Sequence, residues 1–387
     1  MKFGVVSLGN HAINRVAPAI VSSGNKIDAV FSTNQNKASD FAKKYGCNQH
    51  GVLEELLKED IDAVYISSPN FLHYKKQHYA LVGEHSAVKV CHWTKSQMTG
   101  GASCYKGTFY GINSHQCVQM TPALNSCTEN CSFCWRFQGF DSMKISYEDD
   151  PEFILEESIK AHMKLISGLK GNPKVTPEMW KEASTPKHLA ISLTGEPTLY
   201  SRLGEFIELA GRRGISTFLV TNGTLPMVLE KLNPLPTQLY VTTAGPTKEI
   251  FNEVLNPAIG NAWENFNKTL ELLPSLDTRK VIRHTLVKDV NMPFIDEYAR
   301  MDSIADPDYI ESKGYVHVGQ SITRLTQDNM PSHDYIVEFS RELASRLGYD
   351  FTSERRDSRV TLLCKDPSKR FIDFRAIEEV PITLASS

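Results

Sequence analysis

The sequence contains no apolar run long enough to cross a bilayer, and its start, MKFGVVSLGN, lacks the charged region and apolar stretch of a secretory signal. We therefore expect a soluble, cytoplasmic protein. An excess of charge is also absent, because 42 lysines and arginines oppose 45 aspartates and glutamates, for a net charge of −3. That balance argues against a uniformly basic nucleic-acid-binding protein. Two local clusters of lysine and arginine, at 160–188 and 354–375, suit either a phosphate backbone or an ordinary solvated surface.

Cysteine is scarce, with eight residues in 387, and six of the eight lie between 91 and 134. A secreted disulfide scaffold would carry more cysteines and spread them more widely, so a reducing compartment and bound metal explain them better. The length allows two or three domains with substantial hydrophobic cores.

Three cysteines fall in one short loop, C-T-E-N-C-S-F-C, as Cys127, Cys131 and Cys134. Three thiolates at this spacing can hold one face of an iron–sulfur cube and leave its fourth iron without a protein ligand. Zinc is the alternative, although it usually takes four nitrogen or sulfur ligands in pairs, which a triplet fits poorly. The loop therefore predicts an iron–sulfur site with one open iron.

The other three cysteines of this region, Cys91, Cys104 and Cys117, are spaced thirteen residues apart and make no short loop. Three separate turns can still bring them together, and three ligands would again leave one iron open. The spacing alone leaves their role undecided.

These segments carry a resemblance that covers about residues 78–375. C-x3-C-x2-C with an aromatic residue before the last cysteine, here Phe133, is the signature of radical S-adenosylmethionine (SAM) enzymes. The runs V-K-V-C-H-W-T-K, C-Y-K-G-T-F-Y-G-I-N-S-H-Q-C-V-Q-M-T-P-A-L and C-S-F-C-W-R resemble the archaeal-type tRNA 4-demethylwyosine synthases, which carry six cysteines at this spacing. The resemblance implies SAM and two [4Fe–4S] clusters as cofactors. It places one cluster on Cys91, Cys104 and Cys117 and the other on Cys127, Cys131 and Cys134.

A second motif, T-G-E-P-T, follows the apolar run H-L-A-I-S-L, at the end of a strand where α/β barrels place their ligands. It is similar to the G-G-E-P motif with which radical SAM enzymes hold the methionine ammonium of SAM. The T-N at a later strand end lies where the family lines its cofactor pocket. The resemblance therefore implies a cofactor site made of Thr194, Gly195, Glu196, Pro197, Thr221 and Asn222. Nearby, Ala244 occupies a position where the family usually has Asp.

After Cys134 the sequence alternates helical patterns with apolar runs that end in polar turns, as in S-T-F-L-V-T-N-G-T, Q-L-Y-V-T-T-A-G-P and Y-I-E-S-K-G. By the resemblance, such units imply an α/β fold with the partial (β/α)6 barrel of the radical SAM enzymes. We expect four parts: a truncated Rossmann-like fragment at 1–77, a second-cluster segment at 78–125, the barrel at 126–345 and a C-terminal extension at 346–387.

Residues 1–77 follow the pattern strand, helix, strand, helix, strand, which is half of a nucleotide-binding sheet. They resemble the first half of the dinucleotide domain of the Gfo/Idh/MocA oxidoreductases, notably in I-D-A-V-Y-I-S-S-P-N-F-L-H. The fingerprint G-x-G-x-x-G would fall on Ser7, Gly9 and Ala12, so its first glycine is missing. The resemblance also stops near Gln77, before the catalytic lysine of those enzymes. We interpret this half-Rossmann βαβαβ segment as an appended fragment rather than an NAD-dependent catalytic domain.

The main resemblance implies a lyase of wybutosine biosynthesis. Such an enzyme uses SAM to take a hydrogen from the methyl group of N1-methylguanosine 37 in tRNA-Phe, and joins the base to a two-carbon unit of pyruvate to form 4-demethylwyosine. A lysine amine can hold pyruvate as a Schiff base, and the family's candidate lies two residues after the second cysteine, at Lys106. The implied partners are the tRNA anticodon loop, pyruvate and an electron donor of unknown identity, and we expect a monomer.

Three hypotheses stay open on the sequence. They are this tRNA-modifying radical lyase, a radical SAM enzyme that acts on another substrate, and an NAD-linked oxidoreductase with structural cysteines. The cluster loop and the G-E-P turn by themselves establish only the superfamily, so the second stands beside the first. The missing glycine of the fingerprint weighs against the third.

Overall fold

The computed structural model describes residues 1–8, 12–32, 34–66, 77–136, 138, 143–145 and 147–378. The chain divides into two compact units, Met1–Tyr79 and Ala80–Ser387, each of which is described by itself below. Gly9 of the expected phosphate turn and the segment S-S-P-N-F-L-H lie outside the described residues.

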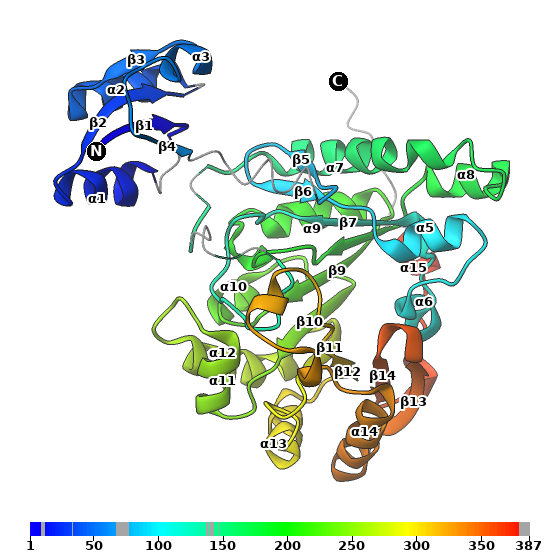
Figure 1. The fold of residues 1–387 in the computed structure, drawn as a ribbon. Helices are drawn as coiled ribbons and strands as arrows, with labels where there is room; N and C mark the ends of the chain where they lie inside the picture. The colour runs from blue at the N-terminus through cyan, green and yellow to red at the C-terminus, as the bar shows by residue number, and fades with distance from the viewer. Residues whose placement is uncertain are drawn as a thin grey trace. The chain divides into compact units, whose positions relative to one another are not determined.

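The strands and helices alternate along most of the chain (Figure 1). The strands are β1 Lys2–Val6, β2 Lys26–Phe31, β3 Asn48–His50, β4 Ala63–Ile66, β5 Ala80–Val82, β6 Ser86–Val88, β7 Cys117–Thr121, β8 His188–Ile191, β9 Ser216–Thr221, β10 Gln238–Thr243, β11 Arg279–Leu286, β12 Tyr309–Gly314, β13 Asp350–Arg355 and β14 Val360–Cys364. The helices are α1 Ala17–Ser22, α2 Gln35–Tyr45, α3 Leu53–Leu56, α5 His92–Met98, α6 Tyr105–Tyr110, α7 Pro151–Ile166, α8 Pro177–Ala183, α9 Leu203–Arg212, α10 Pro226–Lys231, α11 Lys248–Leu255, α12 Ala262–Leu272, α13 Ile295–Ala305, α14 His333–Leu347 and α15 Arg375–Glu378. A π-helix, η1 Ala12–Val16, leads into α1, and short 3-10 turns include η2 Ser114–Gln116, η4 Pro197–Leu199 and η9 Pro367–Lys369.

The first unit is a four-stranded parallel sheet in the order β3-β2-β1-β4, which confirms the predicted half-Rossmann pattern. Helix α2 is capped at its start by Asn34, whose side chain accepts a hydrogen bond from the Lys37 amide, and at its end by Gly46, whose φ of 64° lies in the left-handed region. Strand β3 was not predicted. Its residues, N-Q-H, are polar because the strand lies at the edge of the sheet, so no apolar run marks it.

The second unit is built on a ten-stranded sheet in the order β13-β14-β12-β11-β10-β9-β8-β7-β6-β5. The six strands β7 to β12 pair in parallel, and antiparallel strands complete both edges. This is the predicted partial (β/α)6 barrel. Within the described residues, no helix combines the length and the apolarity needed to span a membrane.

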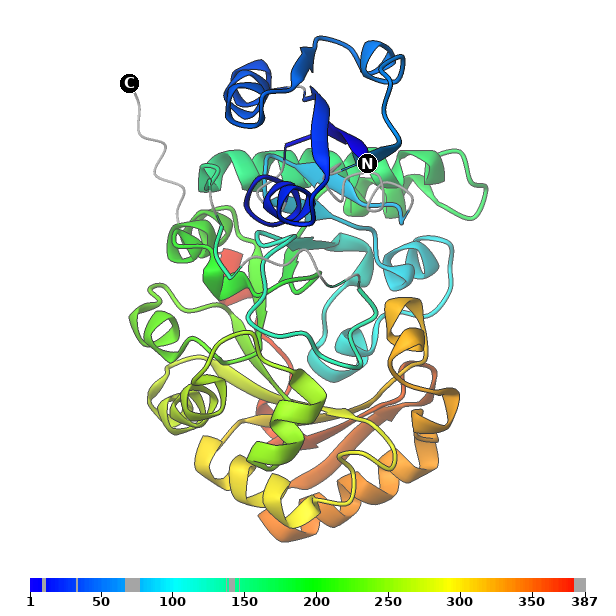
Figure 2. The ribbon, with the colours of Figure 1, turned by 60° about the vertical axis from the view of Figure 1, so that its left-hand side comes forward.

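Alternate residues of the parallel strands face two different hydrophobic layers, as the two-residue period of a strand requires. On one side, Leu219, Leu239 and Ile282 pack in a core with the helices that connect the strands. These helices, from α9 to α13, follow one another along the outside of the curved sheet (Figures 1 and 2), and α14 continues the row in a separate core with Leu286 and Ile310. On the other side, Phe218 and Tyr240 pack in a separate core inside the barrel. Both faces are buried, which explains why the strands are continuous apolar runs in the sequence.

Helix α6 fills part of the barrel interior, although it precedes the first barrel strand in the chain. Its Tyr105, Phe109 and Tyr110 belong to the same core as residues of β9, β10, β11, β12 and β14. Phe109 and Tyr110 are fully buried. The segment between β6 and β7 is therefore part of the packed barrel.

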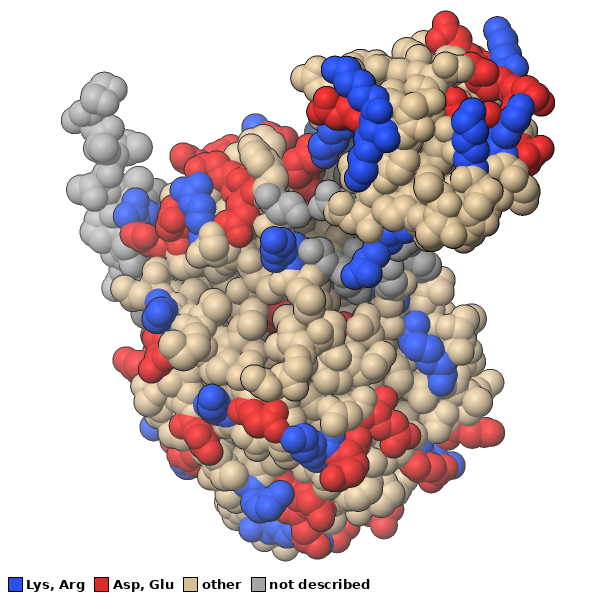
Figure 3. Space-filling view, turned by 90° about the vertical axis from the view of Figure 1, so that its left-hand side faces the viewer, with Lys and Arg blue, Asp and Glu red and all other residues tan. Residues whose placement is uncertain are grey.

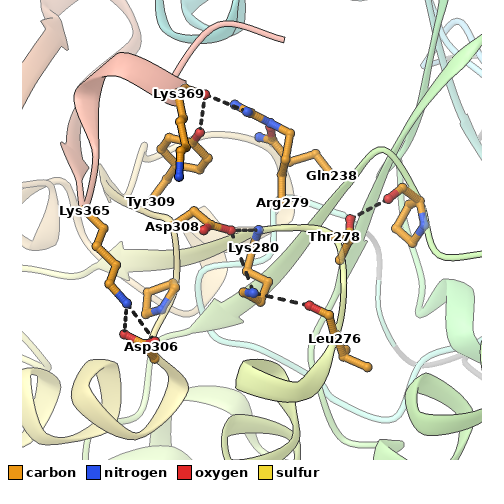
Figure 4. Close-up of polar contacts among 12 residues, drawn as sticks. Gln238, Leu276, Thr278, Arg279, Lys280, Asp306, Asp308, Tyr309, Lys365 and Lys369 are labelled. Atoms are coloured by element: carbon orange, nitrogen blue, oxygen red, sulfur yellow. Dashed lines mark hydrogen bonds and ion pairs between the residues drawn. The ribbon is translucent and has the colours of Figure 1, made fainter. Parts of the chain in front are cut away.

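Arg279 ties the segment after β14 to the amino end of the barrel (Figure 4). Its guanidinium donates to the carbonyl oxygens of Lys369 at 2.7 Å and Arg370 at 2.6 Å, and to Gln238 Oε1 at 3.0 Å. It also stacks 4.7 Å from the ring centroid of Tyr309, whose hydroxyl donates to the same Lys369 carbonyl. In the same view, Lys365 makes a more exposed ion pair with Asp306.

We predict that Arg279→Ala loosens residues 367–372. Removal of two charge-assisted hydrogen bonds should lower the free energy of local opening of this segment by about 2 kcal/mol, measured by amide hydrogen exchange. The matched control is Lys365→Ala, which removes a half-exposed ion pair and should cost less than about 1 kcal/mol. Equal effects of the two substitutions would contradict the anchoring role of Arg279.

Candidate active site

A cavity of about 730 Å³ opens at the carboxyl ends of the parallel strands, where α/β barrels place their ligands. Its wall includes the ends of β8, β9, β10, β11 and β12, together with the cysteine loop and the segment around α5 and α6. The strand ends contribute polar side chains, among them Ser192, Thr242 and Thr285.

All six cysteines singled out in the sequence line this cavity. Cys91 and Cys104 immediately precede α5 and α6, and Cys117 opens β7, so three separate elements supply the widely spaced set. Burial is the main cause that raises the pKa of Cys117 and Cys131, and the other members of each set add to it: Cys91 and Cys104 act on Cys117, and Cys134 and Cys127 act on Cys131. The structure therefore groups the cysteines into the two predicted triplets around one space.

Burial favours the protonated form of several of these thiols. It raises the pKa of Cys104 to about 11 and that of Cys117 to about 12, and it raises the pKa of Cys131 well above the usual range. A bound metal supplies the positive charge that stabilises the thiolates.

The donor set fits a polynuclear cluster better than a single ion. Among the residues that the structure describes, no three His, Cys, Asp or Glu side chains meet at a point that one metal ion could occupy. In a [4Fe–4S] cluster each thiolate binds a different iron, so the thiols surround a volume instead of converging.

The T-G-E-P-T turn packs directly against the segment that leads into the cysteine loop. Gly195 has a φ of 69°, and a Cβ atom there would lie 1.8 Å from the carbonyl oxygen of Ala123, so only glycine fits. The amide of Glu196 donates to the carbonyl oxygen of Ser126 at 2.8 Å. Thr194 is held through its carbonyl oxygen by the Thr121 hydroxyl, and Pro197 is buried at the start of η4.

Glu196 is locked in place at the cavity wall. Its Oε1 accepts from the amide and hydroxyl of Thr198 and from the Thr221 hydroxyl, at 2.7 to 3.1 Å. Among the described residues, Oε2 accepts one hydrogen bond, from the Asn222 amide at 2.7 Å. Because a carboxylate oxygen has two lone pairs, Oε2 keeps capacity for a further donor on the cavity side.

Asn222 links the strand end to the cysteine loop, since its side-chain amide donates to Thr128 Oγ1 at 2.8 Å and lies 4.0 Å from the Cys127 sulfur. Of the six predicted cofactor-site residues, five line the cavity, and Pro197 supports the turn from behind. Ala244 is buried, and its carbonyl oxygen accepts from Asn291, so its methyl group belongs to the core.

Lys106 lies in the first turn of α6, two residues after Cys104, and lines the same cavity. The residue is 8% exposed, and Nζ is 4.2 Å from the ring centroid of Tyr240 and 5.0 Å from that of Phe218. Burial, and secondarily the charge of Arg283, lowers the pKa of Lys106 to about 8. A less basic amine of this kind is suited to nucleophilic addition.

A buried network of polar side chains that was not predicted from the sequence lies beside Lys106. Arg283 on β11 pairs with Glu311 on β12, with Nε 3.0 Å and Nη2 2.9 Å from Oε2. Arg283 also donates to the Tyr105 hydroxyl at 2.7 Å, and the Tyr105 and Tyr110 hydroxyls donate to Glu311. A signal was present, because R and E interrupt the apolar strands V-I-R-H-T-L and Y-I-E-S-K-G. A charged residue inside a buried strand needs a partner.

Family models match three segments of the chain. The radical SAM superfamily matches residues 122–301, a family described as wyosine base formation matches 304–365, and the oxidoreductase family with an NAD-binding Rossmann fold matches 1–85. These matches confirm both resemblances found in the sequence.

Similar proteins of known name share most of the second unit. The S-adenosyl-L-methionine-dependent tRNA 4-demethylwyosine synthase of Pyrococcus abyssi is 50% identical over 299 residues, which cover 76% of this chain and 87% of that protein. The Homo sapiens enzyme, TYW1, is 38% identical over 318 residues, which cover 79% of this chain and 43% of that protein.

Solved structures give the same relationship. A structure of TYW1 with a lysine–pyruvate adduct bound has a TM-score of 0.71 and 35% identity, and covers 79% of this chain and 99% of that chain. A structure of archaeal TYW1 has a TM-score of 0.66 and 32% identity over the same shares. Of the three hypotheses left open by the sequence, these findings support the first. The chain belongs to the S-adenosyl-L-methionine-dependent tRNA 4-demethylwyosine synthases, a family of radical SAM enzymes.

Proposed function

We propose that the cavity assembles both clusters, SAM, pyruvate and the target guanosine in one space. The observation that carries this proposal is that two cysteine triplets, the Glu196 turn and Lys106 all line the same cavity. In this assignment Cys127, Cys131 and Cys134 hold the cluster that binds SAM, and Cys91, Cys104 and Cys117 hold the second cluster. When bound, the first cluster and SAM supply a 5′-deoxyadenosyl radical, and the protein orients the reacting groups.

The Glu196 turn positions the methionine end of SAM. Glu196 lines the cavity, and its Oε2, which accepts one hydrogen bond from the Asn222 amide, has a second lone pair suited to an ammonium group. Thr194, Gly195, Thr221 and Asn222 complete the wall around it. Because hydrogen bonds from Thr198 and Thr221 fix the carboxylate, it is oriented before the cofactor arrives.

Lys106 holds pyruvate as a Schiff base. Its amine adds to the keto carbon, and the keto oxygen leaves as water with both amine hydrogens, which forms the C=N bond. The support is its place in the cavity beside Cys104 and Cys117, its burial against Tyr240, and the lysine–pyruvate adduct bound in the TYW1 relative. Fixing the three-carbon unit in this way keeps it near the radical site.

The nucleic-acid substrate is the anticodon loop of tRNA-Phe, with guanosine 37 turned out of its stack to enter the cavity. At the cavity wall, Trp135 is 38% exposed, and its ring lies between Lys89 Nζ at 4.9 Å and the Arg136 guanidinium at 3.9 Å. On the face in Figure 3, Lys and Arg side chains lie among Asp and Glu, so local contacts have to position the RNA. The electron donor stays unassigned, and action as a cytoplasmic monomer is part of the proposal.

The division into parts also stays a proposal: 1–77 as a truncated Rossmann-like fragment, 78–125 as the second-cluster segment, 126–345 as the barrel and 346–387 as the extension. Helix α6 packs inside the barrel, so the second and third parts share one core. The missing first glycine of the fingerprint supports the proposal that residues 1–77 take no part in the reaction.

We predict that each cysteine triplet binds one cluster. Combined Cys127→Ala, Cys131→Ala and Cys134→Ala should halve the iron content after anaerobic reconstitution and abolish SAM cleavage. The equivalent replacement of Cys91, Cys104 and Cys117 should also halve the iron but leave some uncoupled SAM cleavage. The control is Cys364→Ala, since this buried thiol lies in the core and should leave the iron unchanged. Full iron content in either triple variant would contradict the assignment of one cluster to each triplet.

We predict that borohydride traps the Schiff base of Lys106 with pyruvate. Treatment of the enzyme and pyruvate with borohydride should fix a three-carbon adduct on the peptide that contains Cys104, Tyr105 and Lys106, detected by mass spectrometry. Lys106→Arg keeps the charge but removes the nucleophile, so it should eliminate 4-demethylwyosine and spare both clusters and basal SAM cleavage. Product formation at the unsubstituted rate by Lys106→Arg would show that pyruvate is activated in another way.

A chain that begins near His78 should keep its iron and still form 4-demethylwyosine in tRNA, measured by nucleoside analysis with a chemical reductant. The expectation follows because every cavity residue belongs to the second unit. NAD(P)H binding by the full chain that disappears on truncation, together with lost turnover, is the result that would reverse it.

A further inference from the structure

The cavity holds a second lysine, Lys313, at the carboxyl end of β12. It is two residues beyond Glu311 and pairs in register with Thr285 of β11, so it projects from the same face of the strand as Glu311. Lys313 is partly buried and lines the cavity. Its Nζ donates to the carbonyl oxygen of Ser358 at 2.9 Å and lies 5.0 Å from the ring centroid of Tyr105.

Lys313 has no carboxylate partner among the described residues, since none comes within 4 Å of its Nζ. The neighbouring cation, Arg283, is different, because it forms an ion pair with Glu311 and donates a further hydrogen bond to the Tyr105 hydroxyl. Among the described residues, Lys106 and Lys313 are therefore two cations of this part of the cavity for which no carboxylate lies within ion-pair distance. A cation in a low-dielectric space gains most from an anion that arrives there.

The two lysines border the same compartment. Nζ of Lys106 and the guanidinium carbon of Arg283 lie 4.2 Å and 4.5 Å from the ring centroid of Tyr240. Arg283 then donates to Tyr105, the ring against which Lys313 packs. Both lysines also interact electrostatically with the same groups, Arg283, Glu311 and Cys104. A small molecule attached to Lys106 consequently lies in the field of Lys313.

We propose that Lys313 binds the carboxylate of the keto acid that condenses with Lys106, and so selects 2-keto acids over neutral carbonyl compounds. The proposal rests on the proposed role of Lys106. Condensation consumes the keto group, with loss of its oxygen as water, and leaves the carboxylate on the adjacent carbon. That carboxylate has left bulk water and needs a charged partner, which Lys313 supplies while Lys106 is occupied as the nucleophile.

The test compares pyruvate with methyl pyruvate, which has the same keto group but no charge. The reconstituted enzyme is incubated with each compound and sodium cyanoborohydride, and the concentration for half-maximal labelling of Lys106 is read by mass spectrometry. For Lys313→Met, this concentration should rise roughly tenfold to a hundredfold for pyruvate, as loss of a charge-assisted hydrogen bond implies. For methyl pyruvate it should stay within about twofold.

Two further variants distinguish the effect of the charge of Lys313 from an effect on folding. Lys313→Gln keeps a donor for the Ser358 carbonyl oxygen but removes the charge, so it should show the same selective loss for pyruvate even if the Met variant folds poorly. Lys280→Met is the matched control, since this partly buried lysine lies at the amino end of β11 and donates to the Leu276 carbonyl oxygen (Figure 4). It should leave both concentrations unchanged. Iron content and the visible absorption of the clusters are recorded for every variant.

Each other outcome overturns the proposal. Unchanged pyruvate labelling in Lys313→Gln would assign the carboxylate to another partner, such as the open iron of the second cluster. An equal loss for both compounds would make Lys313 a positioning residue for the compartment. Labelling of the peptide that contains Lys313 would identify it as the nucleophile, and the absence of any Lys106 adduct in the unsubstituted enzyme would overturn the role of Lys106 as well.

Discussion

The close approach of Gly195 to the segment before the cysteine loop is the contact on which the site depends. A side chain at this position would collide with the carbonyl oxygen of Ala123, and the next residue, Glu196, is hydrogen-bonded to Ser126. Ser126 directly precedes Cys127, so the turn after β8 and the loop with three thiols are fixed to one another. A larger residue at position 195 would collide with this segment and move Glu196 away from the cysteine loop.

Charge is distributed unevenly within the cavity. Lys106, Lys313 and the Arg283–Glu311 pair lie beside the widely spaced triplet of cysteines, and Glu129 and Glu196 lie beside the short loop. Burial raises the pKa of both Glu129 and Glu196, that of Glu129 to about 8, so a cationic ligand beside them would favour their ionised forms.

The sequence predicts those parts of the molecule whose residues are close along the chain. The cysteine loop, the T-G-E-P-T turn and the apolar strands are local patterns, and the strands are continuous because both of their faces are buried. The buried network joins Tyr105 and Tyr110 to Arg283 and Glu311, which lie 178 to 206 positions away along the chain, and no local pattern specifies such pairs. Strand β3 was missed for a different reason, since an edge strand of polar residues carries no apolar period.

Helix α6 bears on how such an enzyme can evolve. The helix carries Cys104 at its start and Lys106 in its first turn, yet its aromatic side chains are packed among strands that follow it by more than a hundred residues. A segment of this kind cannot be added to a finished barrel or removed from it without rebuilding the interior. The second triplet of cysteines therefore depends on the packing of the barrel interior, whereas the unit formed by the first residues has a hydrophobic core of its own.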